Sequence, residues 1–387
     1  MSVRVVHVIT GLHTGGAETM LTRLVERSQG RGLEHAVIAL LAGGALGRRL
    51  VEAGIPVIEV GYGPLAPLRI ARWFRAWRPT LCQGWMYHGN LAALAGRILS
   101  GRRIPLGWGI RHCPELPLSE RPLSRVLIHA GGRLSRLTRA IVYCSKASIG
   151  VHEKLGYDPT KTVLVPNGFD CEVLHPRSAA GPALRRQLGL PPATVLIGNV
   201  ARYHPMKDHA NLIRAFARLG AAPGASGDVP PVHLVLIGRG LEVGNVELGA
   251  QLRAAGIARR VSLLGERHDI AELIAGLDVL AVSSAWGEAF PNVIGEAMAS
   301  GVPCVTTDVG DAAWIVGATG IVVPPRDSAA LAAGLERMVA LPSATRQRRG
   351  VAARQRILDH FALPEVVARY VELFHEIAAA EPRHAHA

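Results

Sequence analysis

The sequence lacks the patterns that build metal and disulfide sites. Its five cysteines are scattered, with no Cys-x-x-Cys pair and no Cys/His cluster. Such spacing is typical of reduced thiols and excludes zinc-finger and disulfide frameworks. An Asp-x-Asp pair, which would offer oxygen ligands to a divalent cation at a strand end, is also absent. The sequence therefore predicts a protein that requires neither a metal nor another cofactor.

Long apolar runs are missing too. No stretch reaches the roughly 18–20 apolar residues that cross a bilayer. The apolar run Val3–Thr10 is interrupted by Arg4 and His7, and no small-residue cleavage site follows it, so it does not predict a signal peptide. We expect a cytoplasmic protein that is soluble or lies on a membrane without crossing it.

Charge is distributed unevenly along the 387 residues, whose net charge is +13. Residues 1–177 hold 23 Lys and Arg against 11 Asp and Glu, whereas the remainder holds 20 against 19. Lys is rare and Arg is plentiful. A basic first half beside a neutral second half indicates an anionic partner for the first half, and both nucleic acid and an acidic membrane surface fit this description.

Short apolar runs alternate with longer helical patterns throughout the chain. Most runs carry apolar residues at both parities, as strands buried on both faces do. Strands that alternate with helices predict βαβ units and parallel sheets, and two such series predict an α/β protein of two doubly wound domains. The expected strands are Val3–Ile9, Ala36–Leu41, Val57–Val60, Leu81–Gly84, Pro105–Ile110, Ala140–Cys144 and Thr162–Val165, then Thr194–Val200, His233–Ile237, Arg260–Leu264, Asp278–Ser283, Pro303–Thr306 and Gly320–Val323.

Proline and glycine place the domain boundary near residues 176–192. We expect a first Rossmann-like domain at 1–178 and a second at 190–360. The segment Leu363–Ala380 is amphipathic and is expected to pack back on the first domain. Gly220–Pro231 is predicted to be an exposed loop, and Glu381–Ala387 a disordered tail.

The stretch Asp278–Asp308 is the richest in chemistry. A buried strand is followed by a loop with Glu288, and Pro291 is expected at the first position of a helix that continues past Glu296. The backbone amides of Asn292 and Val293 would face out of the start of this helix, where anions bind. Two carboxylates then flank a phosphate-sized site, one able to accept hydrogen bonds from sugar hydroxyls and the other from a ribose diol.

A set of ordered motifs resembles the retaining GT-B glycosyltransferases of family 4 (glycosyl transferases group 1). Glu288 and Glu296 are separated by seven residues within EAFPNVIGEAMASGVPCVTTDVG, as in the signature of that family. A lone pair of this kind is weak, but six segments in family order are specific. The other five are TGGAE (14–18), LVPNGFD (164–170), VARYHPMKDHANLIRAF (200–216), LVLIGRG (234–240) and RVSLLGERHDIAELIAGLDVLAVSS (260–284).

The resemblance implies a fold and roles for individual residues. Two Rossmann-like domains would face one another across a cleft, with the acceptor on the first and a UDP- or GDP-linked sugar donor on the second. Arg202 and Lys207 would neutralise the diphosphate, Gly238 would form a glycine turn, and specificity would reside in the loops at Glu288–Phe290 and Glu266–Arg267. On this basis the expected donor-binding residues are Gly16, Gly238, Phe290, Asn292, Val293, Glu296 and Arg267.

Three residues of the first domain are further candidates. Gly16 follows the first strand and opens a helix, where the backbone can approach a phosphate, although a tight strand-to-helix turn explains the glycine equally well. His88 and Arg111 follow two other strands, whose carboxyl ends face the crevice in doubly wound folds. Family resemblance places His88 near the transferred sugar, but a lone histidine is more often structural. Arg111 would bind a charged group of the acceptor or pair with Glu115.

Arginines interleave with aromatic residues in Leu68–Arg78 (LRIARWFRAWR), and Ser119–Arg139 adds five more arginines. This pattern suits an anionic membrane surface, and an ordinary helix packed on the sheet with its arginines outside explains it as well. No nucleic-acid motif supports the other anionic partner. The basic half thus favours a lipid-linked saccharide acceptor at the inner face of the cytoplasmic membrane.

The sequence predicts a retaining, metal-independent hexosyltransferase of envelope polysaccharide, lipopolysaccharide or exopolysaccharide synthesis. Its catalytic candidates are Glu288, Arg202, Lys207 and His88. Two alternatives remain: an inverting GT-B enzyme or epimerase, and a non-catalytic sugar-nucleotide-binding partner of a polysaccharide assembly complex.

Overall fold

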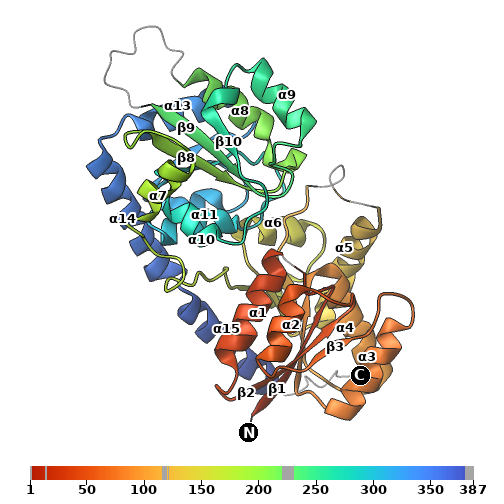
Figure 1. The fold of residues 1–387 in the computed structure, drawn as a ribbon. Helices are drawn as coiled ribbons and strands as arrows, with labels where there is room; N and C mark the ends of the chain where they lie inside the picture. The colour runs from red at the N-terminus through yellow and green to blue at the C-terminus, as the bar shows by residue number, and fades with distance from the viewer. Residues whose placement is uncertain (1, 14, 116–119, 121, 220–230, 380–387) are drawn as a thin grey trace. The chain divides into compact units, whose positions relative to one another are not determined.

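The computed structural model describes residues 2–13, 15–115, 120, 122–219 and 231–379. The chain divides into two compact units, each built on one parallel β-sheet (Figure 1). Unit 1 comprises Met1–Gly168 and Leu363–Ala387, and unit 2 comprises Phe169–Ala362. The α/β fold with two parallel sheets, expected from the alternation of strands and helices, is confirmed.

Unit 1 contains a seven-stranded sheet with the order β3-β2-β1-β4-β5-β6-β7, in which all neighbours run parallel. The strands are β1 Val3–Ile9, β2 Leu33–Ala39, β3 Val57–Glu59, β4 Leu81–Trp85, β5 Leu106–Ile110, β6 Ala140–Tyr143 and β7 Thr162–Leu164. The helices are α1 Gly16–Ser28, α2 Ala45–Glu52, α3 Ala66–Trp77, α4 Met86–Ser100, α5 Pro122–Leu134, α6 Lys146–Lys154 and α15 Leu363–Ala379, with 3-10 turns η1 Ser135–Leu137 and η2 Pro159–Lys161.

Both faces of this sheet are covered by helices. Successive residues of a strand point to opposite faces, so the apolar strands place side chains in a core on each side. On β1, Val5 joins the core that includes residues of α1 and α15, whereas Val6 joins the core that includes residues of α3 and α4. The last helix, α15, buries its apolar side, including Tyr370 and Phe374, in the first of these cores. It packs beside α1, as the blue helix next to the red one in Figure 1 shows.

Unit 2 contains a six-stranded parallel sheet with the order β10-β9-β8-β11-β12-β13. The strands are β8 Val195–Val200, β9 Val232–Ile237, β10 Val261–Leu263, β11 Val279–Val282, β12 Cys304–Thr307 and β13 Ile321–Val323. The helices are α7 Ala180–Gln187, α8 His209–Arg218, α9 Val246–Ala254, α10 Ile270–Ala275, α11 Asn292–Ala299, α12 Ala312–Val316, α13 Ser328–Val339 and α14 Ser343–His360, with 3-10 turns η3 Pro205–Lys207, η4 Ala258–Arg260 and η5 Gly317–Thr319.

The division between the units falls at Gly168 and Phe169, ten residues before the end of the first domain expected from the sequence. Phe169 explains the difference, because its ring stacks 6.2 Å from that of Phe290 and Gly295 closely approaches it, both in unit 2. The proline- and glycine-rich stretch therefore lies inside unit 2.

Two sequence expectations fall largely outside the described residues. The loop predicted at Gly220–Pro231 is described only at Pro231, and the predicted tail Glu381–Ala387 is not described. Within the part of the chain that is described, no helix has the length and apolar character needed to span a bilayer.

Candidate active site

The strand order of unit 2 reverses between β8 and β11. From β8 the chain moves to β9 and β10 on one side, and it then returns to β11 and continues to β12 and β13 on the other. In open α/β sheets, ligands bind outside the carboxyl ends of the two strands at such a reversal. The loop after β8 carries Arg202 and Lys207, and the loop after β11 carries Glu288. The fold thus brings the predicted cations and the predicted carboxylate to one point.

Lys207 and Glu288 form an ion pair at this point. The Lys207 Nζ donates to Glu288 Oε1, although the residues are 81 positions apart in the sequence. Their side chains are only 19% and 12% exposed, so water screens the pair less than it would at an open surface. The Ser284 hydroxyl donates to the same carboxylate oxygen at 2.8 Å. The sequence predicted both residues of the pair for this site but not their direct contact.

The loop that presents Lys207 is held in an unusual backbone conformation. Asp208 has a φ of 47°, in the left-handed region that non-glycine residues rarely adopt. Its carboxylate accepts from the Asn211 amide at 3.1 Å and caps α8, which helps to retain this conformation. Strained backbone of this kind is concentrated at functional loops.

His204 lies in the same loop and was not singled out from the sequence. Its Nδ1 accepts from the Met206 amide at 3.2 Å and caps the η3 turn. Partial burial, followed by the positive charges of Arg202 and Lys207, lowers the pKa of His204 below its ordinary value. His204 thus lies close enough to both cations for their charges to oppose its protonation. A single His between two cations was the available sequence signal.

Gly238 supports this loop from the side. Its φ is 139°, and a Cβ at this position would lie 2.1 Å from the carbonyl oxygen of Ala201. Only glycine allows this close approach between the turn after β9 and the backbone just before Arg202. The predicted glycine turn is present, while its contact with a donor stays a prediction.

The helix after Glu288 begins one residue later than predicted. Pro291 is the N-cap, with a φ of −68° and a ψ of 95°, and α11 starts at Asn292. The first amides of a helix have no acceptor within the helix, so Asn292 and Val293 hold the positions expected for an anion site. Glu296 lies further along α11 and is half-buried. Gly301, with a φ of 76°, follows the end of the helix as expected.

Two predicted donor-binding side chains are engaged elsewhere. Phe290 is 6% exposed, and its ring lies among those of Phe169, Trp314 and Phe361. Its ring is therefore packed within unit 2, and the predicted contact of this residue with the donor stays a prediction. Arg267 forms a bidentate pair with Asp269, at 2.8 and 2.6 Å, after the edge strand β10. The ring partners of Phe290 come from distant parts of the chain, so the sequence could not reveal them, whereas Asp269 is only two residues from Arg267 and was not weighed as its partner.

Unit 1 has its own strand-order reversal, between β1 and β4. After β1, Gly15 caps α1 and Gly16 is exposed at its first position. After β4, the chain turns at Met86, whose φ of 61° is again unusual for a non-glycine residue, and reaches His88. Burial lowers the pKa of the half-buried His88. The topology therefore places Gly16 and His88 at the same edge, while their roles stay predictions; Thr14, from the same motif as Gly16, is outside the described residues.

Arg111 follows β5 at the same sheet edge and is held by neutral groups. Its guanidinium donates to Asn167 Oδ1 and to the Tyr370 hydroxyl on α15. It also lies 4.9 Å from the centre of the Trp85 ring. These contacts orient the cation without cancelling its charge, which favours its predicted role in binding an anionic group.

A chain of buried hydrogen bonds runs beneath Arg111. Trp85 Nε1 donates to His7 Nδ1 at 3.1 Å, so the neutral His7 ring carries its proton on Nε2 and donates to His35 Nδ1 at 3.0 Å. His35 Nε2 then donates to the Ser28 hydroxyl at 2.9 Å, and Ser28 donates to the Leu24 carbonyl at 2.6 Å. Each group in the chain has a partner only when both histidines are neutral.

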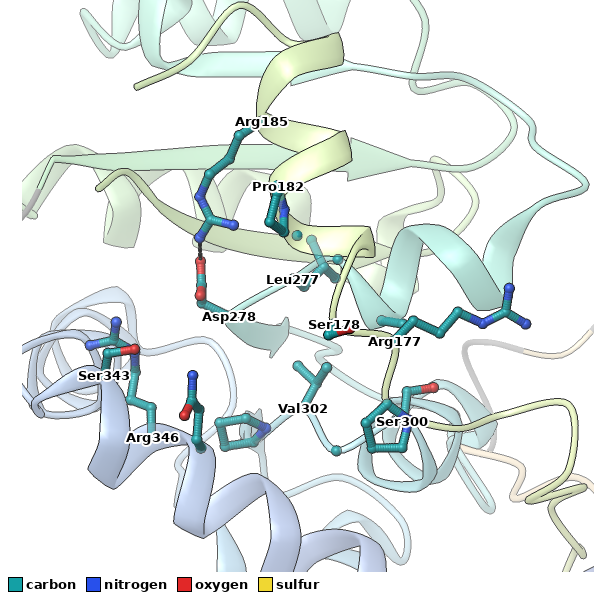
Figure 2. A pocket seen from close by; sticks show the side chains of 17 residues that line it. Arg177, Ser178, Pro182, Arg185, Leu277, Asp278, Ser300, Val302, Ser343 and Arg346 are labelled. Atoms are coloured by element: carbon teal, nitrogen blue, oxygen red, sulfur yellow. Dashed lines mark hydrogen bonds and ion pairs between the residues drawn. The ribbon is translucent and has the colours of Figure 1, made fainter. Parts of the chain in front are cut away.

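A cavity of about 490 Å³ lies at the opposite edge of the unit 2 sheet. Its lining includes Asp278, just before β11, and Pro303, just before β12. Figure 2 shows Arg185 of α7 pointing to Asp278, with which it forms an ion pair, while Arg346 lies on α14. Arg346 donates to the carbonyls of Val339 and Leu341. Arg185 therefore joins α7 to the start of β11, and Arg346 joins α14 to the end of α13.

The described residues contain no group of three or more His, Cys, Asp and Glu side chains that could hold a metal ion. Histidines lie in the neutral buried chain of unit 1, in the loop of His204, and in the contacts of His152 with Tyr87 and of His112 with Glu120. The loops at the strand reversal of unit 2 carry the cations Arg202 and Lys207 and the carboxylate of Glu288.

Two family models match successive parts of the chain. The model of Glycosyltransferase Family 4 matches residues 14–173, and that of Glycosyl transferases group 1 matches residues 192–340. Together they cover most of both units.

Individual relatives agree with these matches. The chain is 26% identical over 313 residues to a Bacillus subtilis (strain 168) protein named as a glycosyltransferase, EpsF, covering 79% of each chain. It is 35% identical over 215 residues to the D-inositol 3-phosphate glycosyltransferase of Stackebrandtia nassauensis, covering 53% of this chain and 46% of the relative. It is 28% identical over 157 residues to the UDP-Gal:alpha-D-GlcNAc-diphosphoundecaprenol alpha-1,3-galactosyltransferase of Escherichia coli, covering 41% of this chain and 39% of the relative.

Solved structures share the fold. HepE of Anabaena, crystallised with UDP and glucose, superposes with a TM-score of 0.82 at 22% identity, covering 97% of this chain and all of HepE. A glycosyltransferase from Rickettsia africae superposes with a TM-score of 0.83 at 17% identity, covering 98% of this chain and all of that one. At these identities the likeness shows the fold alone.

Proposed function

The chain belongs to glycosyltransferase family 4 (glycosyl transferases group 1) and has the GT-B fold, and we propose that it transfers a sugar, with retention of anomeric configuration, from a UDP- or GDP-linked donor to a saccharide acceptor. Unit 2 would bind the donor and unit 1 the acceptor. HepE, which shares the fold, was crystallised with UDP-glucose, which supports a nucleotide-sugar donor.

The observation that carries this proposal is the Lys207–Glu288 pair at the strand reversal of unit 2. A nucleotide sugar needs positive charge for its diphosphate and hydrogen-bond acceptors for its sugar hydroxyls. Lys207 and Arg202 supply the positive charge, and the Glu288 carboxylate supplies the hydrogen-bond acceptor for the sugar hydroxyls. All three lie in loops that follow the adjacent strands β8 and β11.

The chemistry would be driven by stabilisation of the leaving group. As the bond from the anomeric carbon to the phosphate oxygen breaks, negative charge grows on the diphosphate. Arg202, Lys207 and the first amides of α11 are the groups of unit 2 that would stabilise this charge. The acceptor hydroxyl would attack from the same face of the sugar, and the departing phosphate oxygen would take its proton. Glu288 would orient the sugar, Glu296 would bind the ribose, and His88 would lie on the acceptor side.

We further propose that no metal ion takes part. In metal-dependent sugar transfer a divalent cation offsets the negative charge of the diphosphate. In this protein the side chains of Arg202 and Lys207 would offset that charge instead. Addition of EDTA should leave the initial rate unchanged, whereas a fall in rate that Mg²⁺ or Mn²⁺ reverses would contradict this part of the proposal.

The acceptor is proposed to be lipid-linked and presented at an anionic membrane, as in envelope polysaccharide, lipopolysaccharide or exopolysaccharide synthesis. The Escherichia coli relative is named for a diphosphoundecaprenol-linked acceptor, which supports a lipid carrier. Arg111, held by neutral groups in unit 1, is suited to bind an anionic group of such an acceptor. The enzyme would then work at the inner face of the cytoplasmic membrane.

Unit 1 also has a surface suited to this membrane. Residues 60–114 contain eight arginines and no Asp or Glu. Arg75 of α3 donates to the Ser100 carbonyl at the end of α4, and Arg97 of α4 donates to the Leu137 carbonyl of η1, so these three segments are adjacent. Exposed apolar and basic side chains at the end of α4, just after it, at the end of α5 and in η1 form what we call the basic surface: Ile98, Leu99, Leu137, Arg102, Arg103, Arg133 and Arg136.

The aromatic residues of α3 contribute less to this surface than the sequence suggested. Trp73 and Trp77 stack on each other at 4.8 Å, are partly buried, and pack against the core. The side chains available to insert into a membrane interface are therefore the aliphatic ones of the basic surface, with arginines beside them. This combination favours anionic lipid. Of the five arginines in the second predicted segment, Arg121 lies outside the described residues.

The proposal is tested with the wild-type protein. Thermal shift with UDP, GDP and their sugars would identify the donor, because a ligand that binds only the native state raises its stability. Transfer to an undecaprenyl diphosphate-linked sugar is then followed by NMR. An α-linked product from an α-linked donor is expected. An inverted product would contradict retention, and stabilisation by nucleotide sugars without transfer to any lipid-linked acceptor would support a non-catalytic binding protein.

A further inference from the structure

Two buried serines follow β11 and contact both members of the Lys207–Glu288 pair. Ser283 and Ser284 are each 1% exposed. The Ser283 hydroxyl donates to the backbone carbonyl of Lys207 at 2.7 Å, and the Ser284 hydroxyl donates to Glu288 Oε1 at 2.8 Å. Two adjacent residues after β11 thus bind the backbone of Lys207 and the side-chain carboxylate of Glu288.

We propose that Ser284 is a positioning residue that orients the Glu288 carboxylate toward the donor sugar, and that Ser283 does the same for the Lys207 loop and the donor diphosphate. This inference rests on the proposed function, since it concerns the same donor site. The two serines would have separable effects, one on the sugar and one on the diphosphate.

The geometry at Glu288 supports the role of Ser284. Both Ser284 and Lys207 donate to Oε1, and among the described residues none donates to Oε2. One carboxylate oxygen is therefore held by the protein, and the other is oriented and remains able to accept from a sugar hydroxyl. A free glutamate side chain would instead lose rotamer freedom when the sugar binds, which weakens binding.

The serines are themselves fixed by the sheet. The Ser284 carbonyl accepts from Thr307 Oγ1 at 2.7 Å, and Thr307 is fully buried at the end of β12. The Ala285 amide donates to the Met206 carbonyl at 2.8 Å, which joins the β11 loop to the Lys207 loop a second time. Functional groups held through such supporting contacts on rigid strands keep their geometry better than groups on free loops.

The test measures binding of UDP-glucose and UDP, and of GDP-mannose and GDP, by calorimetry, using whichever pair the wild type binds. Ser284→Ala should weaken nucleotide-sugar binding by about tenfold, as expected for a lost hydrogen bond to a charged group, and leave nucleotide diphosphate binding within twofold. Ser283→Ala should weaken both ligands by similar factors. In a Glu288→Ala background, Ser284→Ala should have little further effect, because it acts through Glu288.

A control separates positioning from general stability. Ser262→Ala removes a comparable hydrogen bond in unit 2, to His233 at 2.9 Å, but lies on β10 away from the pair. Ser262→Ala and Ser284→Ala should lower the melting temperature to a similar extent. Ser262→Ala should leave the affinities for the nucleotide sugar and for the nucleotide diphosphate unchanged. Equal loss of sugar and diphosphate binding in Ser284→Ala, or wild-type affinity for the nucleotide sugar, would overturn the role of Ser284 while leaving the proposed function intact. If the wild type binds none of these ligands, the proposed donor class fails and this inference fails with it.

Discussion

The ammonium of Lys207 and the carboxylate of Glu288 are in direct contact at the strand reversal of unit 2. Each is the other's ionic partner until a ligand arrives. A diphosphate would compete with Glu288 for Lys207, and a sugar hydroxyl would compete with Lys207 for Glu288. Binding of a nucleotide sugar would thus replace one charge pair by two sets of contacts, at little cost in unpaired charge.

Replacement of Glu288 by Gln should lower turnover more than tenfold while the fold survives. Gln has the same shape but loses the charge that orients the sugar, and it leaves Lys207 without its ionic partner. The measurement is kcat with a saturating nucleotide sugar, with far-ultraviolet circular dichroism as the check on folding. A folded Glu288→Gln protein with at least half of the wild-type kcat would refute the assigned role.

Unit 1 should lose stability as the pH falls from about 6.5 toward 4. Burial lowers the pKa of His35 to about 4 and that of His7 well below its ordinary value. The unfolded chain, with ordinary pKa values near 6.5, therefore binds more protons than the native state in this window. His35 would cost about 2 kcal/mol of unfolding free energy between pH 7 and pH 5, and His7 would add to this loss.

Urea unfolding at pH 7 and pH 5 measures this loss. His35→Gln should be less stable at pH 7, since the chain from Trp85 to Ser28 is broken, but should lose about 2 kcal/mol less than the wild type on going to pH 5. An unchanged pH dependence in His35→Gln would show that other groups cause the acid sensitivity.

Replacement of Arg111 by Lys should raise the KM for the acceptor and leave the KM for the donor nearly unchanged. Lys cannot reproduce the planar contact with the Trp85 ring together with bonds to Asn167 and Tyr370. A rise of at least fivefold for the acceptor is expected. Tyr370→Phe removes one of the orienting hydrogen bonds and should show a smaller change in the same direction. Equal changes in the two KM values would indicate a structural defect instead.

The basic surface should direct the protein to anionic membranes. Sedimentation with vesicles containing phosphatidylglycerol should exceed that with phosphatidylcholine alone and should weaken as salt is added. Arg102→Gln, Arg103→Gln and Arg136→Gln together should lower binding at least tenfold, because each arginine near the surface contributes roughly 1 kcal/mol.

A matched control removes the same charge from unit 2. Arg253, Arg259 and Arg348 are exposed there, and their combined replacement by Gln should leave vesicle binding within a factor of two. Equal losses in both triple variants would mean that net charge, and not the basic surface, governs association.

Much of the fold could be predicted from the sequence because its signals are local. Runs with apolar residues at both parities marked every strand of the two sheets, and the amphipathic pattern of Leu363–Ala380 matched α15. Boundaries were less accurate. Phe169 joins unit 2 through aromatic packing with Phe290, a contact between residues far apart in the sequence, and no composition change marks it.

The candidate site could be predicted as a set of loops but not as a set of contacts. The strand order brings Lys207 and Glu288 together, and their ion pair depends on side-chain conformations across β8 and β11. Ser284 gave no signal of its own, because a serine after a strand is common. Arg267 was predicted to bind the donor, and only the structure shows that Asp269 already holds it.

Lys207 and Glu288 are proposed to form the donor site of a sugar transferase. This is tested by comparing the turnover of the wild type with that of Lys207→Ala and Lys207→Gln. The donor is the one identified by thermal shift, and circular dichroism establishes that each variant is folded. We predict that both folded variants transfer sugar more than tenfold more slowly, because the diphosphate leaves without its cation. Near-normal transfer by either folded variant would show that Lys207 does not bind the donor diphosphate.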